Sequence, residues 1–171
     1  MPTLEALNRM DRDAFVAVLG GVYEHSPWVA ERAYARRPFS SRSALAQAMQ
    51  AEVQAAGREA QLALVRAHPE LGVRASEAGA LTESSATEQA RLGLAALSPA
   101  EAERLAELNR RYRERHGFPC IVALARHAAR ETVLAEMERR IGNATEAELS
   151  AAIEQIGHIA AARLEKLVTE A

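Results

Sequence analysis

The sequence predicts an all-α protein, a single compact helical domain of about seven to nine helices that spans residues 1–171. Hydrophobic residues make up 49% of the 171 residues but aromatic residues only 4%, and β-strands depend on β-branched and aromatic side chains. Helix-capping residues recur along the chain, whereas no alternating polar and apolar pattern of useful length appears. The length suits one hydrophobic core.

Two capping signals divide the N-terminal part of the chain. Asp11 is expected to cap a short helix that stops at Gly20-Gly21, because an aspartate side chain accepts hydrogen bonds from the first turn and glycine ends helices readily. Ser26 and Pro27 predict a second start, with serine as the cap and proline at the first helical position.

Two further helices are expected before residue 70. Ser43 predicts the start of a helix that ends at Gly57, and one side of this helix carries Leu45, Met49 and Val53. A second helical stretch runs from about Arg58 to Ala67 and is closed by Pro69, because the residue before a proline is biased away from helical geometry.

Capping boxes mark two helices in the C-terminal half. Ser98 to Glu101 form a capping box with proline at the first position, and this helix is expected to run to Gly117. Asn143 follows a glycine at a helix stop. Thr145 and Glu148 then predict a second capping box. It opens a last helix with one apolar stripe, formed by Leu149, Ile153, Ile156, Ala160 and Leu164.

Two segments do not fit this scheme. Pro119 to Leu124 could form a strand or a buried helix, since periodicity cannot separate the two for a short apolar run. Pro69 to Thr82, with Gly72 and Gly79, is the least regular part of the chain. Loops carry function disproportionately, so this segment is a candidate functional loop.

Composition excludes several classes of protein. A formal net charge of -2 argues against a nucleic-acid partner, because phosphate binding normally requires a basic surface. No apolar run approaches the roughly 18 residues of a membrane span, and the N-terminus lacks a signal-peptide pattern. Cys120 is the only cysteine, which excludes an intramolecular disulfide and a thiolate-rich metal site. A cytoplasmic location is therefore expected.

His68 is the first candidate for chemistry. It precedes a proline and follows an apolar helix, so it should lie at a helix C-terminus, where the helix dipole favours the imidazolium form. A histidine held at such a break can act as a general acid or base. Alternatively, it only caps the helix carbonyls.

The run from Ser84 to Gln89 is the second candidate. Glu88 could contribute a catalytic or substrate-binding carboxylate. However, Ser85 and Glu88 have the spacing of a capping box, which needs no catalytic role. The sequence leaves both interpretations open.

Arg163, close to the apolar stripe of the last helix, is the third candidate. Its guanidinium could bind a planar anionic substrate. Alternatively, the side chain is ion-paired, or extends along apolar surface with its charged end in solvent. Nothing in the sequence resembles a phosphate loop, a nucleophile elbow or a metal-binding helix motif.

Taken in order, the motifs resemble the 2-oxo-4-hydroxy-4-carboxy-5-ureidoimidazoline (OHCU) decarboxylase family over almost the whole chain. The blocks that carry the resemblance are Phe15 to Trp28, Arg37-Pro38-Phe39, Ala67 to Leu71, Ser84 to Gln89, Leu108-Asn109 with Tyr112, Gly117-Phe118-Pro119, Arg139 to Asn143, and Ile159 to Leu164. Each block is weak alone, whereas their order and spacing together are specific.

The resemblance implies an all-helical enzyme that needs neither a metal nor a cofactor. It assigns catalysis to His68 and Glu88. It implies that the substrate contacts Pro69, Ser84, Gln89, Phe118, Pro119, Cys120, Ile121 and Arg163. One departure is Cys120, because the family usually has an aromatic residue there. A homodimer is a further expectation from the resemblance.

The implied activity is decarboxylation of OHCU to (S)-allantoin in urate degradation. The substrate carries an imine beside the carbon that loses carbon dioxide, so it can accept the electrons itself, and the protein must supply orientation and a proton. Two alternatives remain on the sequence alone. The chain could be a non-catalytic helical interaction module, or a related enzyme with another small anionic substrate.

Overall fold

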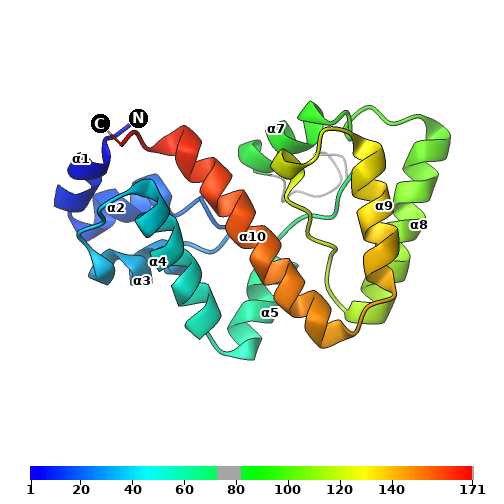
Figure 1. Ribbon diagram of the computed structural model, residues 1–171, viewed down its shortest axis with the longest axis horizontal. Coiled ribbons are helices and arrows are strands. Elements are labelled where there is room, and N and C mark those ends of the chain that lie inside the picture. The colour runs from blue at the N-terminus through cyan, green and yellow to red at the C-terminus, as the bar shows by residue number, and fades with distance from the viewer. Residues whose placement is uncertain (73–81, 171) are drawn as a thin grey trace. The chain divides into compact units, whose positions relative to one another are not determined.

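The computed structural model describes residues 1–72 and 82–170, and over these ranges the all-α prediction is confirmed (Figure 1). The described residues form nine α-helices and two short 3-10 helices. The β-structure assigned to them is a single isolated bridge between Thr3 and Thr169. In the same ranges, no helix has the length and apolar character needed to cross a bilayer.

The chain divides into two compact units. The first contains residues 1–67 and 156–171, and the second contains residues 68–155. Each unit buries apolar side chains of its own, as described below. The prediction of one domain over residues 1–171 stays a prediction.

The first unit is built mainly from the N-terminal helices. Phe15 is fully buried and packs edge-on against Tyr34, with ring centroids 5.5 Å apart, and stacks on Phe39. The chain ends are joined, because Leu4 N donates to Thr169 O at 2.8 Å. The helices are α1 (Leu4–Arg9), α2 (Arg12–Leu19), α3 (Trp28–Ala33), η1 (Tyr34–Arg36), α4 (Arg42–Ala55) and α5 (Arg58–Arg66), with the C-terminal part of α10 (Thr145–Leu167).

The second unit contains α7 (Glu83–Arg91), α8 (Pro99–His116), η2 (Leu124–Arg126), α9 (Arg130–Ile141) and the N-terminal part of α10. Helices α8 and α9 lie side by side (Figure 1). Both helices bury apolar side chains, which include Leu105 and Tyr112 of α8 and Val133 and Met137 of α9. Tyr112 also contacts the rings of His116 and Phe118.

Local signals located two helix starts correctly. Asp11 caps α2, with its carboxylate accepting from Ala14 N at 2.8 Å. Ser98 and Glu101 form the expected reciprocal capping box at α8, and Gly117 ends this helix in the left-handed conformation, with φ of 79°. Both motifs act within a few residues, so the sequence is sufficient to predict them.

Two predicted serine caps were wrong. Ser41, not Ser43, caps α4, with its hydroxyl accepting from Ala44 N at 3.0 Å. Ser26 does not cap α3, because its hydroxyl donates to Glu24 O at 2.9 Å. The apolar side of α4 is nonetheless as predicted, since Leu45, Met49 and Val53 are fully buried.

The predicted capping box of the last helix was also wrong. The helix begins at Thr145 and buries its expected apolar stripe. However, the Thr145 hydroxyl contacts His116 Nδ1 at 3.0 Å. The Glu148 carboxylate accepts from Tyr112 and Arg140 instead of completing a box. The side chains of Thr145 and Glu148 are therefore bound by residues outside the first turn of the helix, and not by each other's backbone.

The apolar run from Pro119 to Leu124 is neither a strand nor an α-helix. It is irregular as far as Ala123 and then enters the 3-10 helix η2. Residues Cys120 to Leu124 are all buried. Buried irregular backbone has no helix or sheet to satisfy its polar groups, so side chains must do so.

Candidate active site

His68 lies two residues beyond the end of α5, as its position before proline predicts. Its side chain is 7% exposed. The loop that follows is fixed from two sides. Asn109 Nδ2 donates to Leu71 O at 2.9 Å, and Gly72 N donates to Gln89 Oε1 at 2.9 Å. The rest of the predicted functional loop, including Gly79, lies outside the described residues.

Glu88 lies in the interior of α7, so the capping-box interpretation of this residue was wrong. Thr82 is the N-cap, and its hydroxyl accepts from Ser85 N at 3.3 Å. Ser85 is therefore inside the first turn. The other interpretation, in which Glu88 supplies a carboxylate to a site, stays a prediction.

The other two predicted residues of this run differ in environment. Gln89 is 6% exposed, and its side-chain oxygen holds the loop after His68 through Gly72 N. Ser84 is exposed. Gln89 therefore has a demonstrated role in fixing the loop, whereas substrate binding by either residue stays a prediction.

The predicted substrate-binding segment from Phe118 to Ile121 is almost entirely enclosed. Phe118, Cys120 and Ile121 are at most 3% exposed, and Pro119 is half-buried. Burial raises the pKa of the Cys120 thiol to about 12. Cys120 therefore carries no thiolate near neutral pH, as expected of a packing residue and not of a nucleophile.

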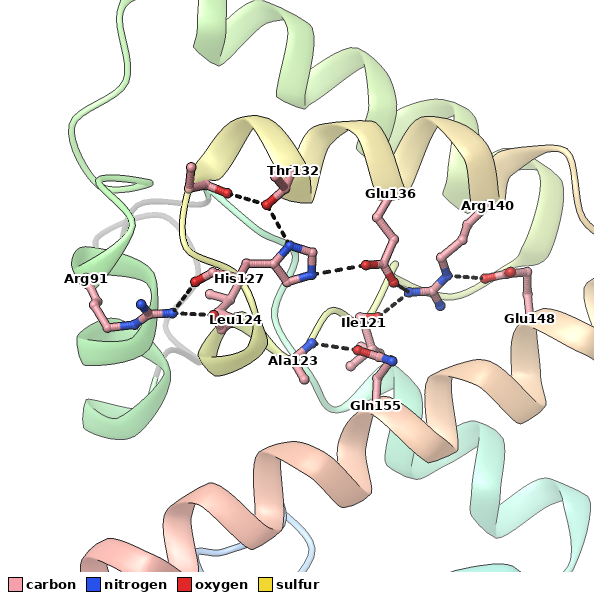
Figure 2. Close-up of polar contacts among 11 residues, drawn as sticks. Arg91, Ile121, Ala123, Leu124, His127, Thr132, Glu136, Arg140, Glu148 and Gln155 are labelled. Atoms are coloured by element: carbon pink, nitrogen blue, oxygen red, sulfur yellow. Dashed lines mark hydrogen bonds and ion pairs between the residues drawn. The ribbon is translucent and has the colours of Figure 1, made fainter.

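Side chains from three helices satisfy the backbone of this segment (Figure 2). Arg140 of α9 donates from Nη1 to Ile121 O at 2.6 Å. Ala123 N donates to Gln155 Oε1 of α10 at 2.9 Å. Arg91 of α7 donates from Nη2 to the carbonyls of Leu124 and His127.

Arg140 belongs to a buried polar network. Its Nε donates to Glu148 Oε2 at 2.9 Å, and Tyr112 Oη donates to the same oxygen at 2.5 Å. Asn143 Nδ2 donates to the other carboxylate oxygen at 2.8 Å. Burial alone would raise the pKa of Glu148, but these hydrogen bonds and the charge of Arg140 hold it below its usual range.

Sequence reasoning missed this network. A signal for Arg140 was present, because it follows Val133 and Met137 at helical spacing and therefore falls on the apolar side of α9. No comparable local signal identified the partners of Arg140. Glu148 had been assigned to a cap, and Ile121, whose carbonyl oxygen accepts from Arg140, lies 19 residues away.

The structure brings three of the predicted blocks into one unit. Helix α7 carries Glu88 and contacts the loop after His68 through Gln89. It contacts the segment after Ile121 through Arg91. Hydrogen bonds therefore join α7 to the loop after the His-Pro block and to Leu124 and His127, which follow the Phe-Pro block, all within residues 68–155.

Arg163 lies in the other unit and is ion-paired. Its Nη1 donates to Glu24 Oε2 at 2.9 Å and to Val22 O at 3.2 Å. Glu24 is fully buried and Arg163 is 4% exposed. The ion-paired interpretation of Arg163 is thus confirmed, and its contact with substrate stays a prediction. Glu24 was not identified from the sequence, although it lies in the first block of the resemblance.

The described ranges contain no group of three or more histidine, cysteine, aspartate or glutamate side chains that could hold a metal ion. The predicted site residues are instead the buried His68, the Glu88 carboxylate of α7 and the enclosed apolar segment from Phe118 to Ile121. The described residues define an all-α protein, and the predicted catalytic pair and the predicted apolar wall lie in one compact unit of it.

Comparison with known proteins identifies the family. A model of the OHCU decarboxylase family matches residues 8–165. The chain is 44% identical over 162 residues to 2-oxo-4-hydroxy-4-carboxy-5-ureidoimidazoline decarboxylase of Haloferax volcanii, which covers 95% of this chain and 94% of that protein. The chain belongs to the OHCU decarboxylase family.

Two longer proteins contain a similar region. The chain is 38% identical to the uric acid degradation bifunctional protein of Bacillus subtilis over 99% of its own length but 33% of that protein. The crystal structure of (S)-allantoin synthase superposes with a TM-score of 0.75 at 33% identity, covering 97% of this chain and 54% of that one. The chain thus spans about half the length of that synthase.

Proposed function

We propose that this protein decarboxylates OHCU to (S)-allantoin, as a step in the degradation of urate. Membership of the OHCU decarboxylase family, extending over nearly the whole chain, is the observation that carries the proposal. The name of the similar (S)-allantoin synthase supports the S configuration of the product.

The substrate contains its own electron acceptor. The bond from the hydroxyl-bearing ring carbon to the carboxylate breaks, and its electron pair forms a double bond to the neighbouring carbon. The imine nitrogen receives the displaced pair and a proton. The resulting enol then loses its hydroxyl proton to become a carbonyl, while the ureido-bearing carbon gains a proton. One proton is consumed and carbon dioxide leaves, so no external oxidant or reductant is needed.

The protein's own residues supply orientation and proton transfer in this proposal. His68 engages the hydroxyl-bearing carbon and handles the hydroxyl proton. Glu88 orients the imidazole or accepts from the ring and ureido N–H groups. Cys120 and its neighbours form an apolar wall that limits access of water. Substrate binding by Arg163, whose guanidinium is paired with Glu24, is carried over from the resemblance alone.

Freshly prepared OHCU incubated with the purified protein tests the proposal. We expect accelerated loss of OHCU and accumulation of the S enantiomer, measured by circular dichroism, because an enclosed site protonates one face of the planar enol. Protonation in free solution favours neither face. Turnover should survive exhaustive chelation without added cofactor. Racemic product at the uncatalysed rate would refute the proposal.

Two coarser expectations accompany this function. A small-molecule substrate requires neither nucleic acid nor a membrane surface, and a single buried cysteine is compatible with the reducing cytoplasm. We also propose a homodimer, on the basis of the family resemblance. Cell fractionation and sedimentation of the purified protein test these two points.

A further inference from the structure

Side chains from α9 and α10, and not regular secondary structure, hold the irregular segment from Phe118 to Ala123 in place. Its residues are buried apart from the half-buried Pro119, yet they form no helix or sheet, and the chain before and after them is helical. Two side chains contact its C-terminal part directly, Arg140 at Ile121 O and Gln155 at Ala123 N (Figure 2). The two hydrogen bonds thus fix two backbone groups, the carbonyl of Ile121 and the amide of Ala123.

Arg140 is itself held rigidly. The Glu148 carboxylate binds its Nε at 2.9 Å, and Glu136 lies 3.5 Å from its Nη1. Glu136 also contacts His127 Nε2 at 3.0 Å. The guanidinium therefore has little freedom to rotate, and the position of Ile121 O is set by α9 and α10.

Stability alone does not explain an arginine at this position. Replacing a buried ion pair by apolar residues is often neutral or stabilising. Moreover, Nη2 of Arg140 is buried and makes no hydrogen bond to any of the described residues, which costs free energy. Burying Arg140 costs free energy, so its role is explained better by the position in which it holds the carbonyl of Ile121.

We propose that Arg140 and Gln155 are positioning residues that hold Ile121 and Ala123, and thereby fix the Phe118–Ile121 wall of the substrate site. The inference rests on the proposed function for the identity of the substrate. It adds two residues that hold the wall without touching substrate. A displacement of the wall by about 1 Å can lower catalytic efficiency roughly a hundredfold. Weakening the hydrogen bonds that hold the wall should therefore have a measurable effect.

The first test uses Cys120, the only cysteine of the chain, as a reporter on the wall. Its thiol is 2% exposed, so labelling by 5,5′-dithiobis(2-nitrobenzoic acid) requires the segment to open. Arg140→Lys should label faster than Arg139→Lys, which changes the exposed neighbour on the same helix. Gln155→Ala provides a second, milder variant, since it removes a partly exposed side chain and no charge.

A destabilised control separates local opening from global unfolding. Val133→Ala removes fully buried methyl groups from α9 and changes none of the side chains that hydrogen-bond to the segment. When urea brings all variants to the same free energy of unfolding, Arg140→Lys and Gln155→Ala should still label faster than Val133→Ala. Equal labelling rates under these conditions would overturn the proposal.

Kinetics with OHCU supplies the second readout. Both variants should raise KM roughly ten- to a hundredfold, the usual size of effect when an orienting partner is lost, with a smaller effect on kcat. A merely structural role would lower the amount of active enzyme and leave KM unchanged, and that result would count against the proposal. (S)-Allantoin should slow the labelling of Cys120 in the unmodified protein and protect less in the variants.

The two proposals fail in different ways. If the unmodified protein does not turn over OHCU, the proposed function is wrong, and the labelling comparison still decides whether Arg140 holds the segment. If the unmodified protein is active and Arg140→Lys and Gln155→Ala match Arg139→Lys in KM and labelling, the positioning role is wrong and the function stands.

Discussion

At the scale of single residues, the environment of His68 separates catalysis from capping. It is buried beyond the end of α5, and the loop after it is held by Asn109 and Gln89. His68→Asn keeps a polar side chain of similar size. We expect kcat to fall about a hundred- to ten-thousandfold, the usual contribution of general acid–base catalysis, with little change in melting temperature. Steady-state kinetics and thermal melts check this, and normal kcat would reduce His68 to a structural residue.

Glu88 can be tested without the ambiguity that the sequence left. It is not part of a cap, because Thr82 occupies that position in α7. Glu88→Gln should therefore melt normally and lose turnover, since glutamine keeps the shape but not the charge. Measuring both quantities on one preparation is sufficient.

Thr82→Ala is the matched control for Glu88→Gln. It removes the real cap, so it should cost about 0.5–2 kcal/mol of stability while turnover per folded molecule is retained. If Glu88→Gln behaves like Thr82→Ala, losing stability but not turnover, the carboxylate has no role in the reaction.

At the scale of elements, α8 provides a prediction that depends on local structure alone. Ser98→Ala removes the hydroxyl that accepts from Glu101 N at 3.3 Å. It should lower the free energy of unfolding by about 0.5–2 kcal/mol and leave KM unchanged, because no predicted site residue lies in this turn. Urea denaturation with parallel kinetics measures both. An altered KM would show that this helix start communicates with the site.

The contrast between Ser98 and Glu148 shows how far sequence reasoning reaches. Both occur in a capping-box pattern, and only the first forms one. Ser98 is exposed, and Glu101 completes the box with one carboxylate oxygen while the other pairs with Arg130. Glu148 is buried beside Tyr112 and Arg140, which bind its carboxylate instead. Helix periods and exposed caps are local, so they could be predicted. Buried polar partners 8 and 36 residues away could not.

The same limit applies to the candidate site. His68, Glu88 and the Phe118–Ile121 segment were identified through the order of short motifs. The support around them was not, because Arg91, Arg140 and Gln155 each bind backbone groups 19 to 36 residues away. Side chain to backbone contacts of this kind leave no periodic trace in a sequence.

At the scale of the whole molecule, buried neutral acids predict sensitivity to alkali. Burial raises the pKa of Cys120 from its ordinary value of 9.0 to about 12, and raises the pKa of Tyr23 and Tyr112 well above theirs. The unfolded chain loses these protons first as pH rises. The stability that Cys120 contributes is therefore complete below pH 9, and that of the two tyrosines below pH 10. Above these values each contribution decreases by about 1.4 kcal/mol per pH unit.

Urea denaturation between pH 8 and pH 12 measures this dependence. Cys120→Ala should remove the earliest part of the decrease, since the thiol has the lowest ordinary pKa of the three groups. A free energy of unfolding that stays level above pH 10 in the unmodified protein would contradict the assignment.

The division of the first unit between two chain segments has a consequence for synthesis on the ribosome. Residues 1–67 emerge first, but Glu24 meets Arg163, and Leu4 meets Thr169, only when residues 156–171 have followed. The second unit is continuous in sequence, so all its contacts are available earlier. Domains usually fold in the order in which they are made. Here the N-terminal segment cannot complete its fold until the last turns of α10 leave the exit tunnel. Until then the Glu24 carboxylate lacks its partner Arg163, and apolar helix faces of this segment stay exposed.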